Sequence, residues 1–302
     1  MLNNHLYRGR FAPSPTGPLH FGSLVAALAS FLDARSHGGE WLVRMEDVDT
    51  TRNVPGAADM ILTTLEAFGF EWDGPVLWQT DRSEAYAEAL ERLKQAGLAY
   101  GCACSRKEIA DSACLPAIDG GLVYPGTCRT GMEGGRAARA WRLRVGFEEM
   151  AFEDRLQGRI AQVLERDVGD FVLRRADGLF AYQLAVTVDD DFQGISDIVR
   201  GADLLASTPR QLWLQRCLGF ATPSYAHLPV VGNAAGEKLS KQTLAPALDA
   251  GRAAELLVKA LSFLGQPVPS GLSRATVGEV WSWARESWAF SAIPRQQLIP
   301  LD

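Results

Sequence analysis

Apolar positions in the first hundred residues alternate between short strand-like runs and longer stretches with a helical period. Residues 7–12 and 40–46 are predicted as strands. Between them lies a helical stretch whose apolar side chains share one face, namely Leu24, Val25, Leu28, Phe31 and Leu32. Further helices are predicted from Pro55 to Gly69 and over 83–96. This strand–helix rhythm predicts an α/β fold with a doubly wound parallel sheet.

The rhythm changes at Gly101. Residues 101–139 are rich in Cys, Gly and Pro and have no sustained period, which indicates a small insertion. Residues 139–145 and 170–188 alternate like strands, and we expect the latter to fold into a hairpin over Asp177 and Gly178.

A helical period returns over 208–220. A strand and an exposed loop are predicted over 227–243, followed by helices near 252–264 and 275–289. We therefore divide the chain into four regions, listed here in order: the first half of a Rossmann-type catalytic domain (1–100), the insertion with its hairpin (101–180), the second half (181–245) and a short helical C-terminal region (246–302).

Composition and charge limit the classes of protein to which the chain can belong. The chain has 302 residues, of which 47% are hydrophobic and 22% charged, and no run approaches the length of a membrane span. The N-terminus lacks the apolar core of a signal peptide, so we expect a cytoplasmic protein. A net charge of −6 argues against a surface coated in positive charge but permits a local basic patch. The short C-terminal region gives no dimerisation signal, and we expect a monomer.

Four of the five cysteines lie between Cys102 and Cys128. In a cytoplasmic protein such a cluster favours a metal site over disulfides, whereas the fifth, Cys217, lies in a helical pattern typical of the core. Cys102, Cys104 and Cys128 can supply three thiolates to a tetrahedral, structural Zn²⁺. The fourth ligand is open between Cys114, Tyr124 and water, and ligand softness alone favours Cys114. Unmetallated thiols are the alternative.

A stiff loop with the sequence RFAPSPTGPLHFGS, residues 10–23, follows the first predicted strand. Ligands of doubly wound sheets bind at this position, beyond the carboxyl end of a strand. Gly22 and Ser23 begin a helix whose N–H groups favour a phosphate, and His20 could donate a hydrogen bond to it. Alternatively, the prolines shape a rigid loop and His20 caps the helix.

A second loop, GEKLSKQ at 236–242, combines glycine, serine and two lysines. Alone it could be a solvated surface loop. Together, the His-x-Gly and Lys-Leu-Ser-Lys motifs resemble the two signatures of class I aminoacyl-tRNA synthetases. RFAPSPTGPLHFGS, RMEDVDTTR, YQLAVTVDD and DIVRGADLL resemble the glutamyl branch, in collinear order over roughly residues 7–245. The resemblance implies the class I Rossmann-type sheet, here with a small zinc-containing insertion.

Only about 60 residues follow Lys241, whereas discriminating glutamyl-tRNA synthetases carry a much longer helical anticodon-binding portion. The short C-terminal region and the cysteine cluster together resemble the glutamyl-Q tRNA(Asp) synthetases. Members of that family activate glutamate with ATP and attach it to queuosine, the wobble base of tRNA(Asp). A short glutamyl-tRNA synthetase that charges a tRNA 3′ end and a catalytically inactive RNA-binding paralogue are the alternatives. A small-molecule nucleotidyltransferase would share the His-x-Gly loop but not the glutamate-pocket residues.

The resemblance also implies residue roles. Catalytic roles fall to His20 and Lys241, and ATP is bound by His20, Gly22, Ser23, Lys238, Ser240 and Lys241. Mg²⁺ is expected with ATP, without an identified protein ligand. The glutamate site comprises Arg10 and Arg200 on the carboxylates, Ser14 as a hydrogen-bonding group, Glu46 on the ammonium and Tyr182 closing the pocket.

The family pattern Cys-x-Cys followed by Tyr-x-x-x-Cys implies Tyr124 as the fourth zinc ligand, after Cys102, Cys104 and Cys128. We also expect Asp47 and Asp49 to be structural partners of Arg44 and Arg52. The arginines after the cysteines either form a local RNA-binding face or face water, namely Arg129, Arg136, Arg139, Arg142 and Arg144.

Overall fold

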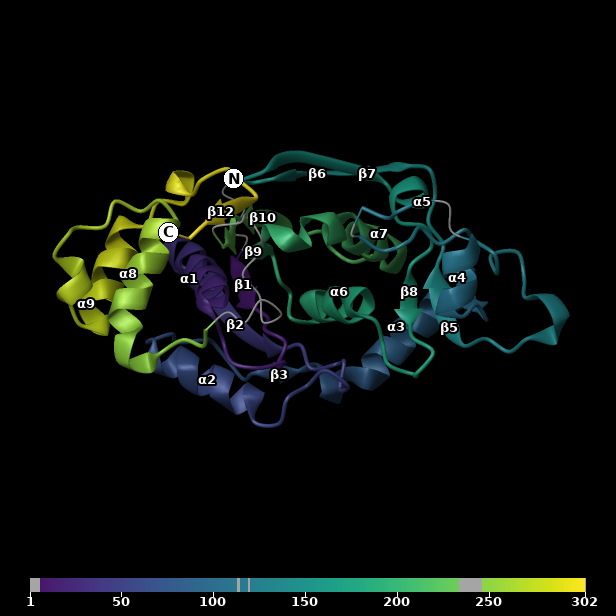
Figure 1. Cartoon of the computed structure of the whole chain (residues 1–302), viewed down its shortest axis with the longest axis horizontal. Helices are drawn as coiled ribbons and strands as arrows, with labels where there is room; N and C mark the ends of the chain where they lie inside the picture. Colours follow the sequence, from purple (N-terminus) through teal and green to yellow (C-terminus); the bar gives the residue numbers. More distant parts are fainter. Residues whose placement is uncertain (1–5, 113–114, 119, 234–245, 302) are drawn as a thin grey trace.

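A computed structural model describes residues 6–112, 115–118, 120–233 and 246–301. The molecule is elongated (Figure 1). Helices α8 (Ala253–Phe263) and α9 (Val277–Ser287) lie at one end, and α4 (Arg106–Ser112) lies at the other. The sheet that carries the site lies between these two ends.

The central sheet is parallel. Strands β1 (Arg8–Phe11), β2 (Glu40–Met45) and β3 (Leu77–Trp78) pair in the order β1-β2-β3. Strands β9 (Asp197–Gly201) and β10 (Ser224–Leu228) form a second parallel pair. Ser196, just before β9, joins the two groups, because its N–H donates to the Arg8 carbonyl over 3.0 Å. Strand order therefore reverses between β1 and β9, which is where doubly wound sheets bind ligands.

Three helices follow the sequence prediction for the first half and confirm it. They are α1 (Phe21–Ser36), α2 (Ala57–Ala67) and α3 (Ser83–Gln95). The predicted apolar face of α1 is fully buried in the main core, where Phe31 packs against Trp41, Phe70 and Trp281. The two predicted C-terminal helices are also confirmed as α8 and α9, and both pack against α1.

The insertion contains a separate antiparallel sheet of β4 (Ala99–Cys102), β5 (Ala140–Leu143) and β8 (Val172–Arg174). A long hairpin of β6 (Glu149–Asp154) and β7 (Gly158–Val163), which the sequence reading did not identify, returns to the central sheet, where Asp154 pairs with Tyr225 of β10. The short helix α5 (Leu164–Asp167) follows it.

The predicted strand over 182–188 is wrong, because Tyr182–Phe192 forms helix α6. The hairpin over Asp177 and Gly178 is limited to one bridge between Arg174 and Phe180. Every residue from Leu184 to Asp190 is buried in α6. A helix buried on all sides has no polar face, so its sequence loses the helical period and resembles a buried strand.

Helix α7 (Thr208–Leu218) confirms the helix predicted over 208–220. Strand β11 (Val230–Gly232) pairs in parallel with β12 (Leu298–Pro300). Short 3₁₀ turns occupy Gln79–Arg82, Glu133–Gly135, Ala202–Ser207, Ala250–Arg252, Leu272–Arg274 and Phe290–Ala292. Among the described helices, none has the length and apolar character needed to cross a membrane.

Candidate active site

One cavity of about 580 Å³ opens where β1 and β9 end. Its lining includes every described residue that the sequence assigned to glutamate or ATP, namely Arg10, Ser14, His20, Gly22, Ser23, Glu46, Tyr182 and Arg200. The remaining three, Lys238, Ser240 and Lys241, lie outside the described residues. Groups from distant parts of the chain therefore meet in a single space.

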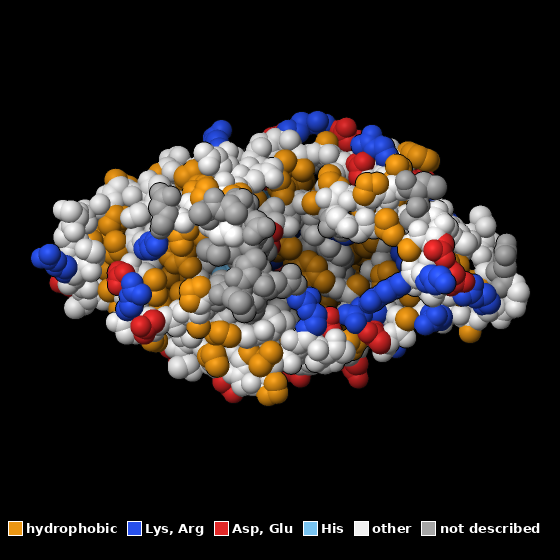
Figure 2. Space-filling model, in the orientation of Figure 1, with side chains coloured by type: hydrophobic (Ala, Val, Ile, Leu, Met, Phe, Trp, Pro, Cys, Tyr) orange, Lys and Arg blue, Asp and Glu red, His pale blue; other side chains and the backbone are white. Residues whose placement is uncertain are grey.

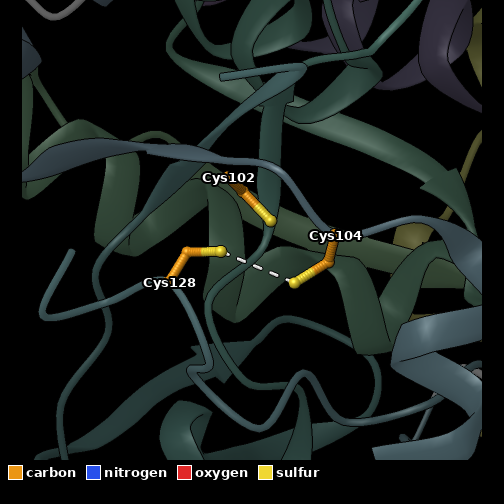
Figure 3. A group of neighbouring side chains, drawn as sticks. All are labelled: Cys102, Cys104 and Cys128. Atoms are coloured by element: carbon orange, nitrogen blue, oxygen red, sulfur yellow. Dashed lines mark hydrogen bonds between the residues drawn. The ribbon is translucent and has the colours of Figure 1, made fainter. Parts of the chain in front are cut away.

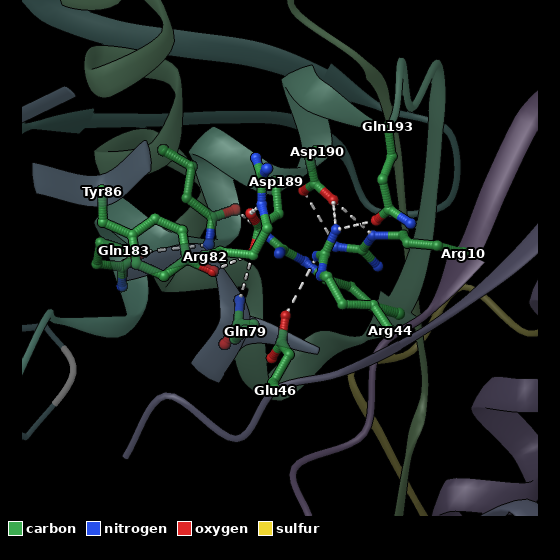
Figure 4. Close-up of polar contacts among 12 residues, drawn as sticks. Arg10, Arg44, Glu46, Gln79, Arg82, Tyr86, Gln183, Asp189, Asp190 and Gln193 are labelled. Carbon is green, nitrogen blue, oxygen red and sulfur yellow. Dashed lines mark hydrogen bonds and ion pairs between the residues drawn. The ribbon is translucent and has the colours of Figure 1, made fainter. Parts of the chain in front are cut away.

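Arg10 belongs to a buried charge network (Figure 4). Its guanidinium donates to both carboxylate oxygens of Asp190, over 3.1 and 3.4 Å. Asp190 also pairs with Arg44 at 2.8 Å, and Arg44 donates to Glu46 over 3.2 Å. Two arginines thus balance two carboxylates, and the network holds the Arg10 guanidinium at the cavity wall.

The carboxylates of this network have shifted pKa values. Burial would raise the pKa of Asp190, but Arg10 and Arg44 outweigh burial and lower it. Burial raises the pKa of Glu46 despite the opposing effect of Arg44 and Arg10. Burial and the charge of Glu46 raise the pKa of Tyr182 to about 12, so its hydroxyl stays protonated at neutral pH.

Arg200 has a different environment. It is 5% exposed, and its Nε donates to Nε2 of His227 over 3.1 Å. Its Nη2 donates to Thr208 Oγ1 and Gln211 Oε1, each over 2.8 Å. Within the described part of the chain, Arg200 forms no ion pair with a carboxylate, and its buried Nη1 has no hydrogen-bond partner. Arg200 therefore presents an uncompensated positive charge at the cavity.

One end of the cavity is built by the start of α1. His20 caps this helix, because its Nδ1 accepts the Ser23 N–H over 3.3 Å. In the neutral ring the proton then lies on Nε2, which makes Nε2 the donor. A Cβ on Gly22 would lie only 3.1 Å from Cε1 of His20. The glycine thus leaves room for the capping ring beside a helix end that favours anions.

Three cysteine thiols converge in the insertion (Figure 3). The Sγ atoms of Cys102, Cys104 and Cys128 lie within 4.8 Å of one another, with Cys104 and Cys128 3.5 Å apart. The Tyr124 hydroxyl lies 3.4 Å from Cys102 Sγ and 3.6 Å from Cys104 Sγ. Zinc bonds of about 2.3 Å to sulfur and 2.0 Å to oxygen give tetrahedron edges of about 3.8 and 3.5 Å. The four groups therefore fit a tetrahedral metal. Cys114 lies outside the described residues.

The expected pairing of Asp47 and Asp49 with Arg44 is wrong, whereas Asp49 does interact electrostatically with Arg52, whose N–H also donates to the Asp49 carbonyl over 3.0 Å. Asp47 accepts hydrogen bonds from the Thr80 N–H and hydroxyl, and Asp49 pairs with Arg175 at 2.7 Å. Neither pairs with Arg44, contrary to the sequence-based expectation. The missed partners of Arg44 are Glu46 and Asp190. Only the Asp-Asp pair that ends the YQLAVTVDD motif could have suggested Asp190 as a site residue.

The arginines after the cysteines do not form one exposed strand face. Arg142 is buried, donates to the Asp170 carbonyl over 2.7 Å and lies 3.7 Å above the Tyr124 ring. Arg144 donates to the carbonyls of Gly97 and Arg129. Through these hydrogen bonds, both side chains stabilise the fold of the insertion. An arginine side chain can either pack over an aromatic ring or extend into water. The alternation of arginines along a strand therefore could not distinguish a structural role from an exposed, RNA-binding one.

Comparisons with known proteins agree with this geometry. The family described as tRNA synthetases class I (E and Q), catalytic domain, matches residues 7–278. The chain is 75% identical to glutamyl-Q tRNA(Asp) synthetase of Dechloromonas aromatica (strain RCB) over 99% of both chains, and 60% identical to that of Chromobacterium violaceum over 99% of this chain and 100% of that protein.

A solved structure shares the fold. The glutamate-tRNA synthetase from Elizabethkingia anophelis superposes with a TM-score of 0.80 at 21% identity, covering 98% of this chain and 68% of that one. The cavity lies at the strand reversal of that shared fold, and the curated relatives match this chain over nearly its whole length. The chain therefore belongs to the class I tRNA synthetases of the E and Q type, among relatives that are glutamyl-Q tRNA(Asp) synthetases.

Proposed function

We propose that this chain activates L-glutamate with ATP and transfers the glutamyl group to queuosine in tRNA(Asp). The observation that carries the proposal is one cavity lined by Arg10, Glu46 and Arg200 on one side and by the N-terminus of α1 on the other. Such a space can hold an amino acid and a nucleotide in contact, which is the main requirement of an adenylate-forming reaction.

Glutamate carries two carboxylates and one ammonium group. Arg200, with its uncompensated charge, and Arg10 are the cations that bind the carboxylates, since a guanidinium donates paired hydrogen bonds to such groups. Glu46 is the anion for the ammonium group. Ser14 and the protonated hydroxyl of Tyr182 complete the polar lining.

ATP occupies the end of the cavity formed by α1. His20 Nε2–H donates to a phosphate oxygen, and the N–H groups of Gly22 and Ser23 face the phosphates. Lys238, Ser240 and Lys241 complete this site by family resemblance, with Lys241 binding the charge that develops on the α-phosphate. Mg²⁺ would bind together with ATP and, like these groups, would neutralise part of the negative charge of the phosphates.

The first step joins glutamate to AMP. A carboxylate oxygen of glutamate attacks the α-phosphorus of ATP, a new O–P bond forms, and the bond to the bridging oxygen of pyrophosphate breaks. The electron pair of that bond leaves with pyrophosphate. No group on the protein is covalently modified, so positioning and charge stabilisation are what the cavity must supply.

The cysteine cluster holds a structural Zn²⁺ through Cys102, Cys104, Cys128 and Tyr124. The interatomic distances that match a tetrahedron support this set. The Cys128 N–H donates to the Tyr124 oxygen over 3.0 Å, and the Arg142 guanidinium lies over the ring. Both contacts favour a negatively charged oxygen in that position, as a zinc ligand requires.

The tRNA meets the half of the molecule that carries the insertion. Lys and Arg side chains gather on that half of the face in Figure 2, beside the centre of the molecule. A local basic surface can bind phosphates even though the whole chain carries a net charge of −6. Identity of 75% to a glutamyl-Q tRNA(Asp) synthetase supports an anticodon stem-loop with queuosine as the RNA.

Isotope exchange between ATP and pyrophosphate tests the activation step. We expect exchange that requires glutamate, needs no tRNA, and is far weaker with glutamine or aspartate. Exchange that appears only after tRNA(Glu) is added would instead support charging of a tRNA 3′ end. No exchange with either addition would support an inactive RNA-binding protein.

A further inference from the structure

Three buried side chains on adjacent strands lead from the β6–β7 hairpin to the cavity. Asp154 ends β6, His227 lies on β10 and Arg200 lies on β9. His227 and Arg200 are register partners on parallel strands, and the β10 residue Tyr225 pairs with Asp154. The exposed fractions of the three are 4%, 0% and 5%. They form a continuous polar chain inside the sheet.

The bonds along this chain fix the proton on the imidazole ring. Nδ1 of His227 lies 2.6 Å from Asp154 Oδ2. Nε2 accepts from Arg200 Nε over 3.1 Å and also lies 3.1 Å from the Thr208 hydroxyl oxygen. An arginine can only donate and an ionised carboxylate can only accept. The ring must therefore be neutral, with its proton on Nδ1. Burial lowers the pKa of His227 to about 4, although Asp154 opposes this shift, which agrees with a neutral ring.

Backbone contacts hold the Asp154 carboxylate in one orientation. Its Oδ1 accepts the N–H groups of Leu156, Gln157 and His227 over 3.0, 2.9 and 3.2 Å. Oδ2 is therefore the oxygen left for the ring. The two oxygens have separate tasks, because one holds the turn of the hairpin and the other orients the imidazole.

We propose that Asp154 and His227 are positioning residues that hold Arg200 in place to bind a substrate carboxylate. This inference rests on the proposed binding of glutamate by Arg200. With Nε held by His227 and Nη2 held by Thr208 and Gln211, Nη1 is the guanidinium nitrogen without a partner in the described part of the chain. Because a neutral ring replaces the usual carboxylate partner, the charge of Arg200 remains available for an anionic substrate.

Asp154→Asn tests the inference with almost no change in shape. The three backbone N–H groups require an oxygen at the Oδ1 position, so the new amide nitrogen must take the Oδ2 position. It then donates to Nδ1 and forces the ring proton onto Nε2, against the Arg200 Nε–H. We expect the KM for glutamate in ATP–pyrophosphate exchange to rise about tenfold, equivalent to about 1.4 kcal/mol. The kcat at saturating glutamate and the KM for ATP should stay within about twofold.

Two variants at the ring provide an independent test if Asp154→Asn does not fold. The side chain of His227→Gln can place an oxygen near the Nε2 position and still accept from Arg200. The shorter side chain of His227→Asn can reach Asp154 but not Arg200. We expect the asparagine variant to have the higher KM for glutamate, and equal KM values would overturn the inference.

The control is Asp170→Asn, which alters another buried carboxylate. Asp170 accepts the Val145 N–H and the Tyr100 hydroxyl in the insertion, away from the cavity lining. The KM of the Asp170→Asn variant for glutamate should equal that of the wild type. An equal rise in both aspartate variants would indicate a general loss of structure and overturn the positioning role.

Nitrogen-15 NMR of the histidine rings reads the tautomer directly. We expect the wild-type ring of His227 to be protonated on Nδ1 and the Asp154→Asn ring on Nε2. A wild-type proton on Nε2 would overturn the inference whatever the activity. A wild type with no glutamate-dependent exchange would contradict the proposed function instead. A wild type that exchanges, beside an Asp154→Asn variant with unchanged KM, would contradict only the positioning role.

Discussion

Arg10 and Arg200, both at the cavity wall, differ in how their charge is balanced. Arg10 and Arg44 share Asp190, and Glu46 supplies a second carboxylate, so the two arginine charges are balanced within the protein. Arg200 has a neutral histidine beside it and no carboxylate partner in the described residues. Coulomb attraction is strong inside a partly desolvated cavity. In the proposed function, Arg200 is therefore the residue that we expect to favour an anionic side chain, as in glutamate, over the neutral amide of glutamine.

Gly22→Ala should separate ATP binding from stability. The new Cβ would approach His20 Cε1 to 3.1 Å and displace the ring that caps α1. Alanine is also a better helix former than glycine, by about 1 kcal/mol. We expect an unchanged or higher melting temperature, a KM for ATP raised about tenfold, and an unchanged KM for glutamate. Exchange kinetics and thermal unfolding measure both effects.

Gly278→Ala is the matched control for this variant. Gly278 is the second residue of α9, as Gly22 is of α1, and a Cβ there meets nothing within 4 Å. It should gain the same helical preference without affecting the KM for ATP. A Gly22→Ala enzyme with wild-type ATP kinetics would contradict the role given to His20.

At the scale of elements, the zinc site proposed for the insertion can be tested ligand by ligand. We expect one zinc per chain in the wild type, loss of that zinc in Cys102→Ser, and about tenfold weaker binding in Tyr124→Phe, which keeps all three thiolates. Zinc content and competition with a chelator measure both. Cys217→Ser should bind zinc normally, because Cys217 lies in α7, outside the cluster. Loss of zinc in Cys114→Ser but not in Tyr124→Phe would contradict this ligand set.

Elements with one buried face could be predicted from the sequence, and elements without one could not. The apolar stripe of α1 and the glycines that end α2 and α3 gave the correct elements. The helix α6 was predicted as a strand because its buried residues run without interruption from Leu184 to Asp190. The β6–β7 hairpin is an exception, because both strands alternate regularly between exposed and half-buried positions, so a period-2 signal was present but was not recognised.

At the scale of the whole molecule, the site residues could be named from motifs, but their partners could not. Asp190 lies 180 residues from Arg10, and Asp154 lies 73 residues from His227. Only tertiary packing brings such pairs together, and periodicity within one element carries no information about them. Motifs therefore identified the residues of the proposed glutamate pocket, but they did not indicate that the charge of Arg10 is balanced and that of Arg200 is not.

Acid should destabilise the whole molecule through His227. Its pKa falls from 6.5 to about 4 on folding, mainly by burial, with Arg200 also lowering it and Asp154 and Asp203 opposing. The unfolded chain therefore binds a proton that the folded chain does not bind. As a result, the free energy of unfolding decreases as pH falls from 6.5 towards 4. Between pH 6.5 and 5 this amounts to roughly 1 to 2 kcal/mol.

Urea unfolding at several pH values measures this contribution. The His227→Gln variant removes the titrating group, so its free energy of unfolding should decrease less than that of the wild type over the same interval, by roughly 1 to 2 kcal/mol. Parallel curves for the two proteins would show that His227 does not titrate on unfolding, contrary to the buried neutral ring described above.

Transfer of labelled glutamate to a defined RNA tests the central claim most directly. The substrates are ATP, glutamate and an isolated tRNA(Asp) anticodon stem-loop, with either queuosine or guanosine at the wobble position. The stem-loop has no 3′ acceptor end, so charging of that end cannot label it. We predict labelling of the queuosine stem-loop alone. Equal labelling of both stem-loops, or labelling only of intact tRNA regardless of its wobble base, would contradict the account.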